Sequence, residues 1–332
     1  MGPFDIVLSY GGPESPEEVE PFLDRILAGK PVPVSRRQAV ARHYLRLGGI
    51  SPLNAQVRGF IDTIAPKLKT RDPGAEILQA NLFAVPLLDD VLCNIAKKIQ
   101  STSDDTREVE VRVFSASAFA GPTCQDRYRQ AVESCRERIE NEIARQGEKA
   151  PRWRFLYSDP FSKNRFFRRA VADTVLEARA RALLEEINPM VLFSAHALPE
   201  EESRAAGYRD DLLHLCASIA RDVGLGEGRA VDDLSKSSPG DWTLVFQSAS
   251  GSPVRPWTGP KITEVLEKIA ASAIKDILVI PVGFVFENME TAYDLDVEIA
   301  SLCQTLGLTY RRGRTVGTRP EMIALALEFF TS

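Results

Sequence analysis

Short apolar runs alternate with longer segments of helical periodicity along the whole of this 332-residue sequence. Several of the runs are rich in Val, Ile, Leu and Phe on both faces, which is typical of strands buried inside a parallel sheet. The alternation therefore predicts an α/β fold in which helices connect neighbouring parallel strands. The predicted strands cover residues 4–9, 76–80, 109–114, 152–157, 190–194, 243–247, 277–281 and 308–311.

Eight strands in two groups of four predict two doubly wound, Rossmann-like halves, each a parallel four-stranded sheet flanked by helices. The polar segment 145–153 contains Gly and Pro and marks the boundary, so the halves are expected at 1–150 and 151–315. Segment 224–241 is rich in Gly, Ser and Asp and predicts a surface loop. The predicted helices cover residues 15–29, 36–46, 53–69, 86–100, 124–146, 161–187, 208–223, 261–273, 288–304 and 319–331.

Composition narrows the classes of partner. The formal net charge is −5, and no window collects the Lys and Arg residues that nucleic acids or acidic membranes attract. No stretch approaches the ~18 apolar residues of a membrane span, and no signal-peptide pattern opens the chain. The five cysteines are scattered and form no C-x-x-C pair. We expect a cytoplasmic protein with reduced thiols and without a membrane anchor, whose partners are small molecules or proteins and not nucleic acid.

Four motifs follow predicted strands, at the sheet edge where open parallel sheets bind ligands. They are "LSYGGPES", "FSAHALPE", "FQSASGSPVRPWTGP" and "PVGFVFENMET", after the first, fifth, sixth and seventh strands. None contains the G-x-G-x-x-G fingerprint of dinucleotide sites or the G-x-S-x-G elbow of serine hydrolases. The sequence therefore argues against a nucleotide cofactor and against serine hydrolysis.

His196 follows the apolar run of the fifth strand and is one of only three histidines. A histidine at a strand end faces the ligand-binding edge, and its imidazole accepts a proton near neutral pH or binds a borderline metal. The alternative is a structural histidine held by hydrogen bonds. His43 and His214 lie within predicted helices and are interpreted as structural.

An acidic row follows the seventh strand, and residues 287–302 contain no basic residue. Glu290, Asp294 and Glu298 are spaced four residues apart, so a helix that begins near residue 288 places them on one face. Two interpretations remain open: a solvated acidic surface, or a path for a hard or borderline metal cation. In the second, crowding raises the pKa of one acid, and Glu290, nearest the pocket, can carry a proton.

These motifs, together with "YLRLGGISPL", resemble the ferrochelatase family over nearly the whole chain. "SAHALPE" is similar to the family's Ser-Ala-His-x-Leu-Pro signature. "PVGFVFENMETAYDLDVE" is similar to its Gly-Phe-x-x-Asp-His-x-Glu segment and the acids that follow it. "PWTGP" is close to the Pro-Trp-Leu-Gly-Pro of the members that use coproporphyrin III. The motifs also occur in the family's order and approximate spacing.

The resemblance implies two Rossmann-like halves with a porphyrin-binding cleft between them, and a C-terminal helix, residues 316–332, that packs back on the first half. It implies insertion of ferrous iron into coproporphyrin III, which gives coprohaem in haem biosynthesis. His196 matches the invariant histidine and Glu290 its partner glutamate, so both are implied as catalytic. The implied metal ligands are His196, Glu290, Asp294, Glu298 and Tyr10.

Tyr10 stands where coproporphyrin-using members typically carry tyrosine, and the loop motifs imply further contacts with the porphyrin. The implied substrate-binding residues are Tyr10, Ser51, Gln247, Ser248 and Trp257, and the aromatic rings expected near them are Phe193 and Phe284. Ser51 is also predicted as a helix N-cap followed by Pro52. No cofactor beyond the substrate Fe²⁺ is expected, and no iron–sulfur cluster, because Cys303 stands alone near the C-terminus. A downstream haem-handling enzyme is an implied partner.

The chain departs from the family pattern in three places. Glu287-Asn288 replaces the Asp-His of the family pattern. After the second strand, "QANLFAVPLLDD" lacks the family's Gly-x-Arg/Lys pattern. After the third strand, "SASAFAGPTCQDRY" carries no His or Tyr where many members have one, although Cys124 is nearby. Three alternatives therefore stay open: a protoporphyrin IX ferrochelatase, a chelatase for another tetrapyrrole or metal, and a non-catalytic porphyrin- or haem-binding paralogue.

Overall fold

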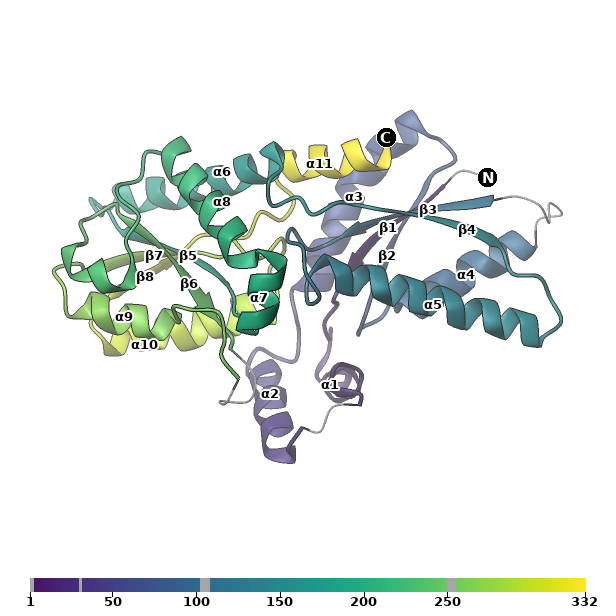
Figure 1. Ribbon diagram of the computed structural model, residues 1–332, viewed down its shortest axis with the longest axis horizontal. Helices are drawn as coiled ribbons and strands as arrows, with labels where there is room; N and C mark the ends of the chain where they lie inside the picture. Colours follow the sequence, from purple (N-terminus) through teal and green to yellow (C-terminus); the bar gives the residue numbers. More distant parts are fainter. Residues whose placement is uncertain (1–2, 30–31, 102–107, 250–254) are drawn as a thin grey trace. The chain divides into compact units, whose positions relative to one another are not determined.

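The chain forms two compact units, each built around one parallel sheet. The computed structural model describes residues 3–29, 32–101, 108–249 and 255–332. The first unit comprises Met1–Ser117, Cys124–Asp159 and Ile323–Ser332, and the second comprises Ala118–Thr123 and Pro160–Met322. Each sheet has four strands with helices on both faces, which confirms the predicted fold class (Figure 1). The domain boundaries predicted near residues 150 and 315 stay predictions.

Both sheets have the same strand order. The first is β2-β1-β3-β4 and the second is β6-β5-β7-β8, and every pairing within them is parallel. In this order the chain reverses its direction of winding between β1 and β3, and again between β5 and β7, which is where doubly wound sheets bind ligands. The strands are β1 (Phe4–Ser9), β2 (Glu76–Asn81), β3 (Glu108–Ser115), β4 (Arg152–Tyr157), β5 (Met190–His196), β6 (Trp242–Gln247), β7 (Asp276–Ile280) and β8 (Thr309–Arg312).

In the part of the chain that the structure describes, ten helical segments lie close to their predicted ranges. Two short elements were missed: α7, and the 3₁₀-helix η2 inside the segment expected to be a loop. The α-helices are α1 (Val19–Leu27), α2 (Val34–Arg46), α3 (Leu53–Arg71), α4 (Leu88–Gln100), α5 (Gln125–Arg145), α6 (Arg165–Leu183), α7 (Glu200–Ala206), α8 (Tyr208–Asp222), α9 (Ile262–Ala270), α10 (Ala300–Thr305) and α11 (Pro320–Phe330). The remaining elements are η1 (Pro16–Glu18), η2 (Val231–Lys236) and the π-helix η3 (Glu290–Ile299).

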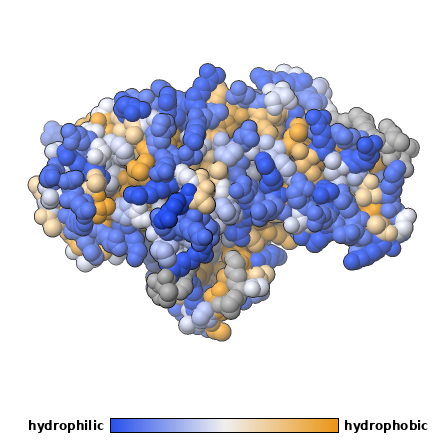
Figure 2. Space-filling model, viewed as in Figure 1, coloured by the Kyte–Doolittle hydropathy of each residue, from blue (hydrophilic) through white to orange (hydrophobic). Residues whose placement is uncertain are grey.

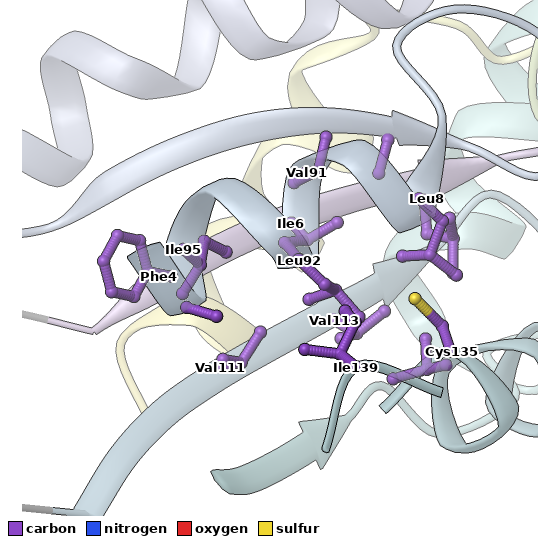
Figure 3. Packing of buried hydrophobic residues seen from close by; sticks show 14 of the residues in the cluster. Phe4, Ile6, Leu8, Val91, Leu92, Ile95, Val111, Val113, Cys135 and Ile139 are labelled. Atoms are coloured by element: carbon purple, nitrogen blue, oxygen red, sulfur yellow. The ribbon is translucent and has the colours of Figure 1, made fainter. Parts of the chain in front are cut away.

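One face of the first sheet packs against α4 and α5. Alternate residues of β1 and β3, among them Ile6 and Val113, point toward Leu92 of α4 and toward Cys135 and Ile139 of α5 (Figure 3). Side chains alternate between the two faces of a strand, so these positions form one continuous apolar layer. The layer fixes the carboxyl end of β1, where the loop that carries Tyr10 begins.

The opposite face of the first sheet is covered by α3 and by the last residues of the described chain. Phe114 is fully buried, and its ring centroid lies 6.0 Å from those of Phe60 on α3 and Phe330 on α11. Asp5 and Arg112 form a buried ion pair on this face, with Nε 2.6 Å from Oδ1. Burial raises the pKa of Asp5 to about 6, although the Arg112 charge and hydrogen bond oppose the rise.

The second sheet is also covered on both faces. One face packs with α9, η3 and α10 through buried side chains such as Val279, Leu295 and Cys303. The opposite face of this sheet packs against α6 and α8, where the ring centroid of Tyr208 lies 6.4 Å from that of Phe246. These two layers hold β5 and β7 side by side, so residues that follow either strand reach the same sheet edge.

Figure 2 shows one face of the molecule, which is predominantly polar, with hydrophobic residues scattered among hydrophilic ones. Within the described residues, no helix combines the length and apolar character that crossing a membrane requires. The five cysteines are free thiols, of which Cys135, Cys216 and Cys303 are buried.

Candidate active site

His196 is the last residue of β5, two residues beyond the predicted end of that strand. Its position depends on Gly283, the glycine that interrupts the apolar run after β7. A Cβ atom on Gly283 would lie 2.7 Å from Ala195 Cβ and 2.8 Å from Ala195 Cα. Such contacts are closer than real Cβ atoms approach, so only glycine lets the loop after β7 lie against the end of β5. This close approach brings the loop next to His196.

The His196 imidazole contacts Glu290. Nε2 lies 3.2 Å from Glu290 Oε1, and Nδ1 lies 2.6 Å from the carbonyl oxygen of Ala197. A carbonyl oxygen only accepts hydrogen bonds, so Nδ1 carries a proton and donates it. A hydrogen bond between Nε2 and Glu290 then requires one more proton, on either the imidazole or the carboxyl group. The pair therefore binds one exchangeable proton.

The electrostatics place that proton on the imidazole at neutral pH. Burial alone would lower the pKa of His196. The charge and hydrogen bond of Glu290, the Ala197 carbonyl and the charge of Asp294 outweigh burial and raise the pKa from 6.5 to about 9. His196 was expected to be a neutral base, but in the protein without substrate it is cationic below about pH 9.

Glu290 opens a π-helix and not the α-helix that the sequence predicted. η3 covers Glu290–Ile299 and continues as α10. Asn288 holds its start: the Asn288 amide oxygen accepts a hydrogen bond from Thr291 N at 3.0 Å, and Thr291 Oγ1 accepts one from Asn288 N at 3.0 Å. π-helical turns are rare and occur frequently at functional sites. Asn288 thus replaces an imidazole of the family pattern with a helix cap.

Asp294 is the second acid of the row, and Ser248 holds it. The Ser248 hydroxyl donates a short hydrogen bond to Asp294 Oδ2, and Ser248 adopts a positive φ of 60°, which is uncommon for a residue other than glycine. Burial raises the pKa of Asp294 to about 7. The Ser248 hydrogen bond opposes the rise, and the charges of Glu290 and Glu298 add to it. Asp294 therefore exchanges a proton near neutral pH.

Two other acids of the segment do not belong to the row. Arg312, at the end of β8, contacts Glu287 at 3.0 Å and Asp296 at 2.6 Å. Burial would raise the pKa of Glu287, but the Arg312 charge and hydrogen bonds outweigh it and lower the pKa below 4.5. The acidic segment is thus divided. Arg312, which the sequence reading missed, forms ion pairs with both Glu287 and Asp296. The row that remains comprises Glu290, Asp294 and Glu298.

Glu298 is exposed and lies at the far end of the row. Within the described residues, no three His, Cys, Asp or Glu side chains converge closely enough to hold a metal ion. The predicted ligands of the second unit therefore form a series of separate carboxylates and not one coordination sphere. A series of this kind binds a cation weakly at each position.

Three further predicted residues of the second unit lie around this row. Gln247, at the end of β6, is buried, and its Nε2 donates to the backbone oxygen of Glu290 at 3.4 Å. Trp257 is half-buried and pairs with Pro199, while residues 250–254 of its loop lie outside the described residues. Phe193 does not line a pocket: it is fully buried and packs 5.7 Å from the ring of Trp242. Phe284 is half-buried.

Tyr10 lies in the first unit, after the end of β1. Its ring centroid is 4.6 Å from that of Phe83, and the Arg127 guanidinium lies 5.3 Å from the Tyr10 ring. Cations are attracted to the face of an aromatic ring at this distance. The predicted tyrosine is therefore accompanied by a positive charge that the sequence reading did not assign.

A buried polar network fixes the loop that carries Tyr10. Ser9 Oγ donates to Asn81 Oδ1 at 2.6 Å, and Asn81 Nδ2 donates to Asn54 Oδ1 at 3.3 Å. Ser51 is 3% exposed, and its backbone N donates to Pro13 O at 2.8 Å. Helix α3 begins at Leu53 with Pro52 as its N-cap, so Ser51, the predicted N-cap, lies one residue before the observed one. Buried amides and hydroxyls need hydrogen-bond partners, and this network supplies them. It explains why "NLFAV" begins with a polar residue, Asn81, and why "GGISPLN" contains Ser51 and Asn54.

The fold and this arrangement define a doubly wound α/β protein with a proton-binding His–Glu pair and an acidic helix at the winding reversal of its second sheet. The family model described as ferrochelatase matches residues 6–331. The chain therefore belongs to the ferrochelatase family.

Two relatives match over almost the whole of this chain. A ferrochelatase of Rhodopirellula baltica is 30% identical, with 98% of this chain and 85% of that protein covered. A coproporphyrin III ferrochelatase of Streptomyces griseus is 30% identical, with 97% of this chain and 83% of that protein covered. A solved structure, the sirohydrochlorin chelatase of Bacillus subtilis subspecies spizizenii in complex with cobalt, is 14% identical over 99% of this chain and 93% of that chain, with a TM-score of 0.49.

Proposed function

We propose that this protein inserts Fe²⁺ into coproporphyrin III, with His196 and Glu290 as its catalytic residues. The observation that carries the proposal is the His196–Glu290 contact of 3.2 Å, in which Nδ1 is held by the Ala197 carbonyl so that Nε2 is the nitrogen that exchanges a proton. Metal insertion into a porphyrin releases the pyrrole N–H protons, so the reaction needs a proton acceptor and a route by which protons leave.

The pair changes its protonation when a cation arrives. The negative charge of Glu290 is what keeps the pKa of His196 near 9. A divalent cation at the Glu290 carboxylate cancels that charge and repels a cationic imidazole, so the Nε2 proton is released. His196 is then neutral and accepts a pyrrole proton through Nε2. In this scheme the imidazole becomes a base when iron is present.

Asp294 provides the next position for the proton. It contributes to the electrostatics of His196, and its own pKa of about 7 lets it accept and release a proton at neutral pH. Glu298 is exposed and continues the row toward solvent. We propose that protons leave, and Fe²⁺ enters, along Glu298, Asp294 and Glu290. Oxygen ligands that act singly suit this role because they do not trap the ion.

The choice of coproporphyrin III rests on the relatives and on the first unit. The matched Streptomyces griseus protein is a coproporphyrin III ferrochelatase. Coproporphyrin carries more carboxylate side chains than protoporphyrin, and the Arg127 guanidinium beside Tyr10 is a suitable charge to contact one of them. Tyr10, Ser51 and Trp257 are proposed as porphyrin contacts. Gln247 and Ser248 are proposed to act through Glu290 and Asp294, which they hold.

The test is anaerobic incubation of the purified protein with Fe²⁺ and coproporphyrin III, or with protoporphyrin IX, followed by the porphyrin absorption bands. His196→Ala and Glu290→Gln should each slow metal insertion by about 10²–10⁴-fold, the usual contribution of a general acid or base. His214→Ala is the matched control, because His214 is an exposed histidine on α8. Its rate should equal that of the wild type.

The outcomes separate the alternatives. Faster insertion into coproporphyrin supports the proposal, and faster insertion into protoporphyrin identifies the other ferrochelatase branch. Insertion that persists in both variants removes the His–Glu pair from the mechanism. A porphyrin that binds but stays metal-free with Fe²⁺, Zn²⁺ and Co²⁺ identifies a binding protein.

A further inference from the structure

A cavity of the second unit lies between α6 and the end of β8. Its volume is about 240 Å³, and four arginines line it: Arg181 of α6, Arg311 and Arg312 of β8, and Arg314. The acidic row of the active site is on η3, which packs on the other face of the sheet.

The residues that line the cavity include four arginines and two glutamates. Its two glutamates are already engaged: Glu185 pairs with Arg311 at 2.5 Å, and Glu177 pairs with Arg319 at 2.6 Å. Arg312 forms ion pairs with both Glu287 and Asp296. Arg181 and Arg314 have no carboxylate within salt-bridge distance among the described residues. These two arginines are therefore the guanidinium groups of the cavity that an anion can pair with.

One guanidinium group also has unused hydrogen-bonding capacity. Arg311 Nη1 is buried and has no hydrogen-bond partner among the described residues. The carboxylate of Asp276 is 3.8 Å away, which is beyond hydrogen-bond distance. A buried donor without a partner is unfavourable by about 1–3 kcal/mol, and a bound acceptor relieves it.

The backbone fixes the shape of the cavity. A Cβ atom on Gly313 would lie 2.5 Å from Ile280 Cδ1 and 3.3 Å from Thr174 Cγ2, so β8 ends in close contact with α6. Gly313 N also donates to Val279 O at 2.9 Å. The arginines on either side of Gly313 are thus attached to a rigid strand end, which favours binding because little has to be ordered.

We propose that this cavity binds a small oxyanion that carries at least two negative charges, such as a phosphate group or a polycarboxylate. The planar guanidinium fork matches the paired oxygens of both groups, and arginine is the usual residue for recognising them. The volume admits an anion of that size but not a porphyrin. Because Arg312 also holds Glu287, the anion contacts the residue that fixes the segment before Glu290.

The test is isothermal titration of the full chain, in chloride buffer, with inorganic phosphate and separately with citrate. The variant is Arg181→Gln/Arg314→Gln. The matched control is Arg165→Gln/Arg209→Gln, which removes the same charge from exposed positions of α6 and α8. We expect saturable binding of at least one anion to the wild type, unchanged binding to the control, and about tenfold or greater loss in the Arg181/Arg314 variant.

Thermal unfolding gives a second readout, because a ligand that binds the folded state raises Tm. Phosphate or citrate should raise the Tm of the wild type and of the control more than that of the Arg181/Arg314 variant. Binding of phosphate alone assigns a phosphoryl ligand, and binding of citrate alone assigns a polycarboxylate. Absence of saturable binding by both anions, or equal weakening in the control, overturns the proposal.

Discussion

Replacing Glu290 with glutamine should lower the pKa of His196. The substitution keeps the size of the side chain and an oxygen that can accept a hydrogen bond, but it removes the negative charge. Glu290 contributes to the high pKa of His196 both by its charge and by its hydrogen bond to Nε2. Without that charge, burial, which favours the neutral imidazole, is opposed less strongly, by the Ala197 carbonyl and the charge of Asp294.

The size of the change follows from the wild-type value. A rise from 6.5 to about 9 corresponds to about 3 kcal/mol of preference for the charged form. Glu290 keeps 39% of its side chain exposed and His196 keeps 27%, so solvent screens part of this interaction. We therefore expect the pKa of His196 to fall by about 1–2 units in Glu290→Gln.

The assay is a titration of the imidazole signals in the NMR spectrum of the histidine-labelled protein. Only His43, His196 and His214 contribute signals, so one substitution at His196 assigns them. Glu298→Gln is the control, because Glu298 is exposed and does not contact the imidazole. The reasoning is refuted if the wild-type pKa lies below 7, or if Glu290→Gln and Glu298→Gln shift it equally.

Three further predictions concern stability and the position of the site. The pKa of Asp294 is raised from 3.8 to about 7, so between these pH values the folded state binds a proton that the unfolded state has lost, and wild-type stability falls as the pH rises from about 4 to 7. Asp294→Asn should remove this dependence on pH and raise the free energy of unfolding by about 2 kcal/mol at pH 8. Urea unfolding at several pH values measures both effects. A less stable Asp294→Asn protein at pH 8 would contradict this assignment. Arg312→Met should reduce the free energy of unfolding by about 3–5 kcal/mol, because it removes the positive charge that compensates the largely buried Glu287 carboxylate. Adding Glu287→Gln should restore part of the loss, and no recovery in the double variant argues against the pairing. Gly283→Ala should destabilise the protein by about 1–3 kcal/mol and slow metal insertion, because the new methyl group collides with Ala195. An unchanged free energy of unfolding and an unchanged rate would show that the loop after β7 moves to accommodate the methyl group.

Much of the fold was predictable because it depends on local patterns. Strands buried on both faces produce runs of Val, Ile, Leu and Phe, and all eight runs are strands. The strand order is not written in such runs, since it depends on how the chain winds. Helix α7 is seven residues long, too short to show a helical period, and η2 lies in a segment whose Gly and Ser residues favour loops.

The sequence predicted those site residues that come directly after a strand or share its following helix. His196 was placed by the run before it, and Glu290 and Asp294 by their spacing. Arg312 and Ser248 owe their contacts to residues far away in sequence, so spacing could not reveal them. The "RRGR" at the end of the last strand was a usable signal, because that strand lies beside β7 in the sheet and β7 leads to the acidic segment. The π-helical hydrogen bonding of η3 left no mark in a pattern that suits an α-helix equally well.

The membership of Ile323–Ser332 in the first unit bears on how the chain folds during synthesis. Residues 1–159 leave the ribosome well before this segment, which supplies the Phe330 ring that packs on Phe114. Domains generally fold as they emerge, the N-terminal one first. Here the earlier unit stays incomplete, with one face of its sheet partly uncovered, until the whole of the later unit has been made. We expect the second unit to acquire its native structure first and the first unit to close last.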